Sequence, residues 1–243
     1  MVAPFLTPPP GRRSRPSARA SLLQCCLGLF LAWLGLVADL RAAESTSTGG
    51  TVRVEVKNPK GEFVADAVAS LVPLDRTPVL APPAEPAVIV QDDEEFQPYV
   101  TAIVVGTRVH FPNRDKVAHH VYSVSPAKKF DIPRYRGEPQ DTILFDKPGL
   151  VSLGCNLHDW MAAYVVVLAT PHFAKSGNDG TATVGGLPPG RYRLEVWHPR
   201  ARQTVQRELT IAPGDATTQV ISITLGIDRR IRRAPETGAG GYK

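Results

Sequence analysis

The sequence predicts an all-β protein. Runs of alternating or β-branched residues recur along the chain, turn signals separate them, and no stretch between residues 44 and 226 keeps a helical period. Short strands joined by turns favour sandwiches or barrels over units that alternate strands with helices. We therefore expect two small β-sandwich units.

Residues 1–43 predict a secretory signal peptide. Four arginines precede an apolar run from Leu22 to Ala38, and the small residues Ala42 and Ala43 follow it. A basic start, an apolar centre and a small-residue end are typical of such a signal, so we expect export to the periplasm. Because the apolar run is about as short as a membrane-spanning helix can be, an uncleaved membrane anchor is the alternative.

Two strands, Thr51–Val56 and Ala67–Val72, are predicted at the start of the mature chain, around the turn signal Asn58-Pro59-Lys60-Gly61. A Pro-rich stretch follows, and we assign residues 75–86 as an extended linker. Residues 87–170 form the central block. Its candidate strands are Ala87–Val90, Tyr99–Val105, Arg108–Phe111, His120–Val124, Thr142–Phe145, Leu150–Gly154 and Ala163–Leu168.

The acidic run Asp92-Asp93-Glu94-Glu95 is interpreted as a solvated turn, with docking of a partner as the alternative. The last block continues to residue 226 and contains the strand-like runs TATV, RYRLEVW, Val205–Ile211 and Thr217–Leu225. Residues 227–243 are basic and Gly-rich and predict a disordered tail.

The charge balance gives no support for nucleic-acid binding. The full chain has 28 basic and 23 acidic residues, but residues 1–43 hold five arginines and one aspartate. The mature chain therefore has a net charge of +1. Its only cysteine is Cys155, since Cys25 and Cys26 lie in the predicted signal peptide. An unpaired thiol in an oxidising compartment requires an explanation.

Metal binding supplies that explanation. Cys155, His158 and Met161 stand at C-x2-H-x2-M spacing between two strand-forming runs, and His119 and His120 lie on an earlier candidate strand. Two imidazoles, a thiolate and a weak thioether are the ligands of blue-copper electron-transfer sites. The alternative for this spacing is one face of a short buried helix, which the β-rich flanks disfavour.

The segments GCNLHDWM and FPNRDKVAHHVYS resemble the cupredoxin family, specifically amicyanin and plastocyanin-like proteins with the short ligand loop. The resemblance covers about residues 87–169 and implies a Greek-key β-sandwich that binds one copper ion. In the family an Asn precedes the first His ligand by six residues, as Asn113 precedes His119. The resemblance thus implies His119, Cys155, His158 and Met161 as ligands, and some proteins of this type are grouped with methylamine utilisation.

Two positions depart from the family pattern. His120 stands where the family usually has Asn or another small polar residue, and it remains the alternative to His119 as ligand. We expect it to lie beside the ligands or at the surface, because successive strand residues point to opposite faces. Asp159 adds a charge next to the ligand His158, which we expect to lower the reduction potential or to bias the protonation of that imidazole.

Residues 178–199, NDGTATVGGLPPGRYRLEVWHP, resemble the second half of carboxypeptidase-regulatory-like, transthyretin-type β-sandwich modules. The segment TVRVEVKNPKGEFVADAVASLV, residues 51–72, resembles their first half. We therefore predict a discontinuous module, residues 49–74 and 171–226, with the cupredoxin domain inserted. Two small sequential β units are the alternative.

These features together predict an exported mononuclear copper protein that carries single electrons between redox partner proteins. Structural zinc fits the ligand set less well, because it prefers several cysteines and no thioether. The sequence shows neither a Ser-His-Asp signature nor a Gly-rich phosphate loop, so we do not expect an enzyme. A periplasmic copper carrier or buffer and a structural envelope protein are the alternatives.

Overall fold

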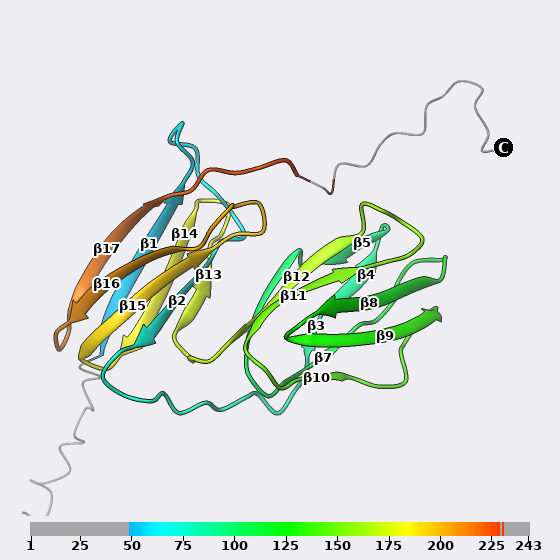
Figure 1. Cartoon of the computed structure of the whole chain (residues 1–243), viewed down its shortest axis with the longest axis horizontal. Helices are drawn as coiled ribbons and strands as arrows, with labels where there is room; N and C mark the ends of the chain where they lie inside the picture. The colour runs from blue at the N-terminus through cyan, green and yellow to red at the C-terminus, as the bar shows by residue number, and fades with distance from the viewer. Residues whose placement is uncertain (1–48, 229, 231–243) are drawn as a thin grey trace, which may run out of the picture. The chain divides into compact units, whose positions relative to one another are not determined.

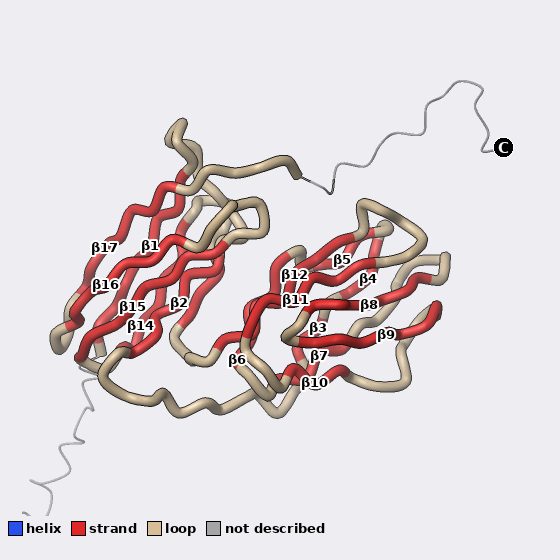
Figure 2. The backbone as a smooth tube through the Cα atoms, viewed as in Figure 1, coloured by secondary structure: helices blue, strands red, loops and turns tan. Residues whose placement is uncertain are grey.

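All regular structure in the residues that the structure describes is β-strand, as the sequence predicts (Figure 2). The structure is a computed structural model that describes residues 49–228 and 230. The predicted signal peptide, residues 1–43, lies outside the described residues, as does most of the predicted tail. Within the described part, no helix is long and apolar enough to cross a membrane.

The first and last parts of the chain form one set of paired strands, which we call the split sandwich. One sheet has the order β14-β1-β17 and the other β13-β2-β15-β16. β1 pairs antiparallel with β14 and parallel with β17, although twelve strands separate β1 from β14 along the sequence (Figure 1). The strands are β1 (Gly50–Lys57), β2 (Val68–Pro73), β13 (Phe173–Lys175), β14 (Thr181–Leu187), β15 (Gly190–Trp197), β16 (Val205–Ile211) and β17 (Ala216–Ser222).

The alternating pattern of β1 explains how this sandwich forms. Val52, Val54 and Val56 are fully buried, whereas Arg53 between them is exposed. These valines share one apolar cluster with residues of the second sheet, including Leu194. Burial of an aliphatic side chain of this kind contributes about 1.5–3 kcal/mol, so the pattern fixes which face of β1 is inside.

The middle of the chain forms the central sandwich. Its sheets have the orders β6-β12-β11-β8-β9 and β10-β7-β3, and β4 pairs with β5 as a separate hairpin. The strands are β3 (Ala87–Val88), β4 (Val90–Asp92), β5 (Glu95–Gln97), β6 (Val100–Val104), β7 (Thr107–His110), β8 (His119–Ser125), β9 (Lys128–Tyr135), β10 (Ile143–Phe145), β11 (Gly149–Gly154) and β12 (Ala162–Leu168).

One apolar cluster fills the central sandwich from both sheets. It includes Val109 and Phe145 from the smaller sheet and Val121 and Val165 from the larger one. Cys155 and Met161 belong to the same cluster, at the point where β11 and β12 are joined. The core therefore extends directly beneath the predicted ligand loop.

The structure differs from the sequence prediction in several strands. Ala87–Val90, predicted as one strand, is split between β3 and β4, and the predicted strand Thr217–Leu225 ends at Ser222. β5, β9 and β13 were not predicted. β9 contains Pro133, which a strand at the edge of a sheet tolerates because its outer backbone donors have no partner strand.

Candidate metal centre

The ligand loop is short because its two strands pair up to its ends. Gly154 of β11 lies opposite Ala162 of β12, so the residues between them form a tight connection. The Met161 N–H donates a 3.0 Å hydrogen bond to the His158 carbonyl and closes the turn. Residues 155–161 form no helix, so the alternative of a short buried helix is wrong.

The sulfur of Cys155 lies between two imidazoles. Its Sγ is 4.0 Å from His119 Nδ1 and 4.0 Å from His158 Nδ1, and the two rings have centroids 5.0 Å apart. The three candidate ligand atoms all lie within 4.8 Å of one another. Cys155 is buried and unpaired, His119 has no exposed surface, and 17% of the His158 side chain is exposed.

These separations fit a single bound metal ion. Metal–thiolate and metal–imidazole bonds of about 2.3 and 2.0 Å, arranged trigonally, place sulfur and nitrogen about 3.7 Å apart. The observed 4.0 Å requires only a small contraction. A buried thiol with two imidazoles is a soft donor set, which suits copper or zinc and disfavours magnesium or calcium.

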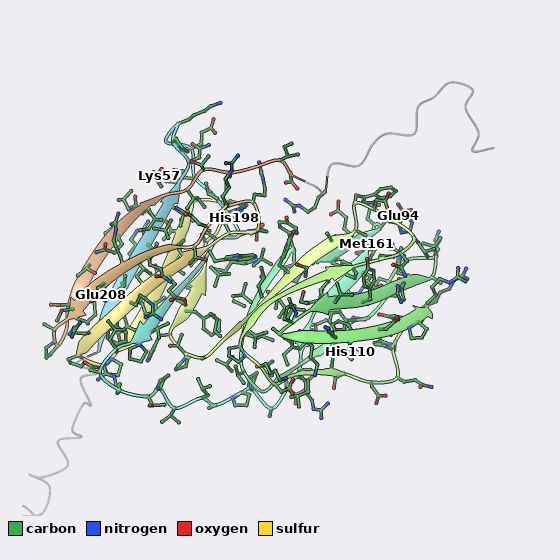
Figure 3. The ribbon with its side chains drawn as sticks, viewed as in Figure 1. Lys57, Glu94, His110, Met161, His198 and Glu208 are labelled. Atoms are coloured by element: carbon green, nitrogen blue, oxygen red, sulfur yellow. The ribbon has the colours of Figure 1, made fainter. Side chains whose placement is uncertain are left out.

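Met161, the predicted fourth ligand, is buried beside these residues. It is 1% exposed and lies in the apolar cluster that contains Cys155. Figure 3 shows it toward the end of the central sandwich where Glu94 also lies, whereas His110 lies toward the other end. A thioether at this point adds a weak, soft donor and no charge.

His119 and His120 have different environments although they are adjacent. His119 faces Cys155, whereas His120 Nε2 is 2.6 Å from Asp131 Oδ1 and its ring stacks on Tyr122. A register shift in the β8–β9 pairing occurs between His119 and Val121. His120 is 8% exposed, so it lies inside the protein and outside the group of candidate ligands.

Asp115 holds His119, a contact that the sequence did not indicate. His119 Nε2 is 2.6 Å from Asp115 Oδ2, and since a carboxylate only accepts hydrogen bonds, Nε2 carries the proton. The lone pair of Nδ1 is then free and faces the sulfur. A carboxylate behind a ligand imidazole is the usual way in which proteins orient a metal-binding histidine.

Asn113 positions Asp115 in turn. Its Oδ1 accepts a 2.9 Å hydrogen bond from the Asp115 N–H, and its Nδ2 donates to the carbonyls of Val117 and Tyr135. Asn113 is buried, and its backbone pairs with Gly137. The six-residue interval from Asn113 to His119 therefore spans a loop in which the Asn113 side chain holds Asp115 and Asp115 holds the His119 imidazole.

The carboxylate of Asp115 is stabilised in its charged form. Burial raises its pKa, but hydrogen bonds from the Glu94 N–H, from His119 and from the Asp93 N–H outweigh burial and lower the pKa below its usual value. Asp115 thus keeps a negative charge behind His119.

A second carboxylate approaches His158. Glu94 Oε2 is 3.9 Å from His158 Nε2, and the His158 ring also packs against Trp160 with centroids 5.2 Å apart. Asp159, the acidic residue expected to influence this imidazole, is exposed. Glu94 belongs to the acidic run that the sequence analysis interpreted as a solvated turn, and only its folded position reveals the proximity.

Comparison with protein families finds a match in the last part of the chain. Residues 161–226 match the model of the carboxypeptidase regulatory-like domain. The match includes β12 and the strands β13 to β17, and it does not include β1 or β2. No curated protein matches the chain.

Solved structures similar to this chain include copper proteins. A purple cupredoxin from Nitrosopumilus maritimus is 26% identical, with 34% of this chain and 99% of that chain covered and a TM-score of 0.30. A variant of amicyanin in its Cu(I) form is 20% identical, with 41% and 98% covered and a TM-score of 0.32. A Cu-containing nitrite reductase from Thermus scotoductus is 25% identical, with 40% and 25% covered and a TM-score of 0.33.

Proposed function

We propose that the protein is an exported mononuclear blue-copper protein of the cupredoxin type, which carries single electrons between redox partners. The observation that carries this proposal is the buried Cys155 Sγ, 4.0 Å from the Nδ1 atoms of both His119 and His158. The ligand spacing and the Asn113–His119 interval favour the amicyanin-like type with a short ligand loop.

Copper in such a site would accept and release one electron by alternating between Cu(II) and Cu(I). The protein contributes by holding one ligand geometry for both states, so that little reorganisation accompanies transfer. The hydrogen bond from His119 to Asp115 and the pairing of Gly154 with Ala162 restrict the ligand positions from two sides. Copper binding would also hold Cys155 as a thiolate, unavailable for disulfide formation.

Electrons would enter or leave at the edge of His158, the ligand histidine with exposed surface. Leu157 beside it in the loop is 45% exposed, and Val117 in the loop before β8 is 43% exposed. A small apolar contact of this kind suits a transient electron-transfer encounter, which buries less area than a permanent complex. We propose redox proteins as partners, with no nucleic acid and no catalytic centre.

The split sandwich is proposed as one discontinuous module, residues 49–74 and 171–226, with the copper domain inserted. The pairing of β1 and β2 with strands from the end of the chain supports this division. A location in the periplasm follows if residues 1–43 act as the predicted signal.

The test is a titration of the purified protein with Cu(II), followed by visible and EPR spectroscopy. We expect one equivalent to give an intense thiolate-to-copper band and a narrow copper hyperfine splitting, both lost reversibly on reduction. Cys155→Ala removes the sulfur and should abolish the band. A colourless complex with ordinary wide splitting would refute the proposal and favour a copper carrier or a structural role.

A matched pair of histidine variants tests which imidazole binds. His119→Gln should lose the band, whereas His120→Gln should keep it, since His120 bonds to Asp131 and not to the sulfur. The reverse result would assign the ligand role to His120.

A further inference from the structure

The turn between β4 and β5 has an unusual backbone. Asp92 pairs with Glu95, so the connection consists of Asp93 and Glu94 alone. Their φ angles are +53° and +57°, which is the left-handed region at both central residues. A two-residue turn of this type favours Asn, Asp or Gly, which adopt positive φ most readily, so Asp93 is ordinary there and Glu94 is not. A glutamate in this conformation indicates a constraint beyond turn formation.

Asp115 supplies the hydrogen bonds that hold this turn. Its Oδ1 accepts from the Asp93 N–H at 2.8 Å, and its Oδ2 accepts from the Glu94 N–H at 2.9 Å. The same Oδ2 is 2.6 Å from His119 Nε2. One carboxylate thus ties the strained turn to a candidate copper ligand.

The turn directs the Glu94 side chain to the other imidazole. Glu94 Oε2 is 3.9 Å from His158 Nε2, and this is its only ion pair within the described part of the chain. The separation is longer than a direct hydrogen bond, so the two groups interact through charge or through a bridging water. Both imidazoles consequently present Nδ1 to the Cys155 sulfur and Nε2 to a carboxylate.

We propose that Glu94 is a positioning residue of the metal site, which the Asp93–Glu94 turn holds against His158. Its carboxylate favours the tautomer of His158 that is protonated at Nε2, so that the Nδ1 lone pair faces the sulfur. Its negative charge also favours Cu(II) over Cu(I) and lowers the reduction potential. The effect on the potential rests on the proposed electron-transfer function, whereas the effect on the tautomer does not.

The physical basis is the chemistry of a neutral imidazole. Such a ring has one N–H and one lone pair, and the group beside one nitrogen decides which nitrogen carries the proton. Partners of this kind typically change metal affinity 10–100-fold when they are removed. Because the added charge stabilises the more positive ion more strongly, the two oxidation states are affected unequally.

The test compares Glu94→Gln with the parent protein. Gln has nearly the same size and keeps the backbone N–H bonded to Asp115, so the turn should persist. In the metal-free protein we expect a smaller fraction of the Nε2-protonated tautomer of His158, measured from the ¹⁵N chemical shifts of the ring. In the copper-loaded protein we expect the ratio of Cu(II) to Cu(I) affinities to fall about tenfold, which raises the potential by about 59 mV.

Glu138→Gln is the matched control. Glu138 Oε2 is 2.6 Å from His110 Nε2 in the same sandwich, so this variant removes the same charge from another histidine–carboxylate pair. An equal change of potential in both variants, or an unchanged His158 tautomer in Glu94→Gln, would overturn the proposal. If the parent binds no copper as a blue site, the proposed function fails, and the tautomer measurement still decides whether Glu94 positions His158.

Discussion

Removal of the Asp115 carboxylate should destabilise the metal-free protein substantially. In Asp115→Ala, three donors lose their acceptor: the Asp93 and Glu94 N–H groups and His119 Nε2–H. His119 is fully buried, so its unsatisfied donor costs about 1–3 kcal/mol, and each of the two turn bonds, one exposed and one partly buried, contributes about 0.5–1.5 kcal/mol. We therefore expect a loss of about 3 kcal/mol in the free energy of unfolding, or about 6–12 °C in Tm for a chain of this size.

Urea unfolding in the presence of EDTA measures this loss without any contribution from metal. Asp115→Asn serves as the graded variant, because its single amide oxygen can still accept from the Asp93 N–H, while an NH2 group in place of Oδ2 accepts neither from the Glu94 N–H nor from His119. We expect it to lose less stability than Asp115→Ala and to bind copper about 10–100-fold more weakly than the parent. Stability of Asp115→Ala within 0.5 kcal/mol of the parent would refute the assigned role of this carboxylate.

Two further predictions concern the split sandwich. His198 is buried, and burial together with the nearby Arg200 lowers its pKa to about 4, so the unfolded chain takes up a proton near pH 6.5 before the folded one does. The free energy of unfolding should therefore fall by about 2 kcal/mol as the pH drops from 6.5 to 4. Urea titrations of His198→Gln should show a smaller fall over that pH range. The same fall in the variant as in the parent would contradict a lowered pKa for His198. Gly190 has a φ of +152°, which L side chains rarely adopt, and an added Cβ would lie 2.5 Å from Asp75 Oδ2 and 2.6 Å from Arg76 Nη2, two side-chain ends that can move. Because of the backbone strain, Gly190→Ala should lower the free energy of unfolding by about 1–3 kcal/mol. Gly214, with φ of +76° and no atom within 4 Å of an added Cβ, is the control, and its Ala variant should lose less stability in the same assay.

The all-β class was predictable because burial follows local periodicity in most strands. Val205–Ile211 matches β16 at both ends, and the alternating valines of β1 are buried as predicted. β9 was missed because its apolar alternation is short: Phe130 and Ile132 flank Asp131, with two lysines before them and Pro133 after them.

The ligand loop could be predicted because its residues are close in sequence. Cys155, His158 and Met161 lie on one connection, and a hairpin of that length brings them together whatever the rest of the fold does. His119 requires one long-range contact, which the Asn113 interval indicated only through resemblance to a family. His120 was separated from it by the alternation of side chains along a strand, and the two residues do have different partners.

The carboxylates behind the imidazoles could not be predicted in the same way. Asp115 lies four residues before His119, an interval that is common by chance, and its value as a partner depends on the loop conformation that Asn113 imposes. Glu94 and His158 are distant in sequence and meet only because a turn with two left-handed residues points toward the ligand loop. Asp adopts the left-handed backbone more often than most residues but Glu does not, and Asp-Glu is ordinary on any solvated surface, so the sequence does not indicate this turn. The acidic run was therefore assigned to a turn, while the charge that this turn brings to the metal site became visible only in the folded chain.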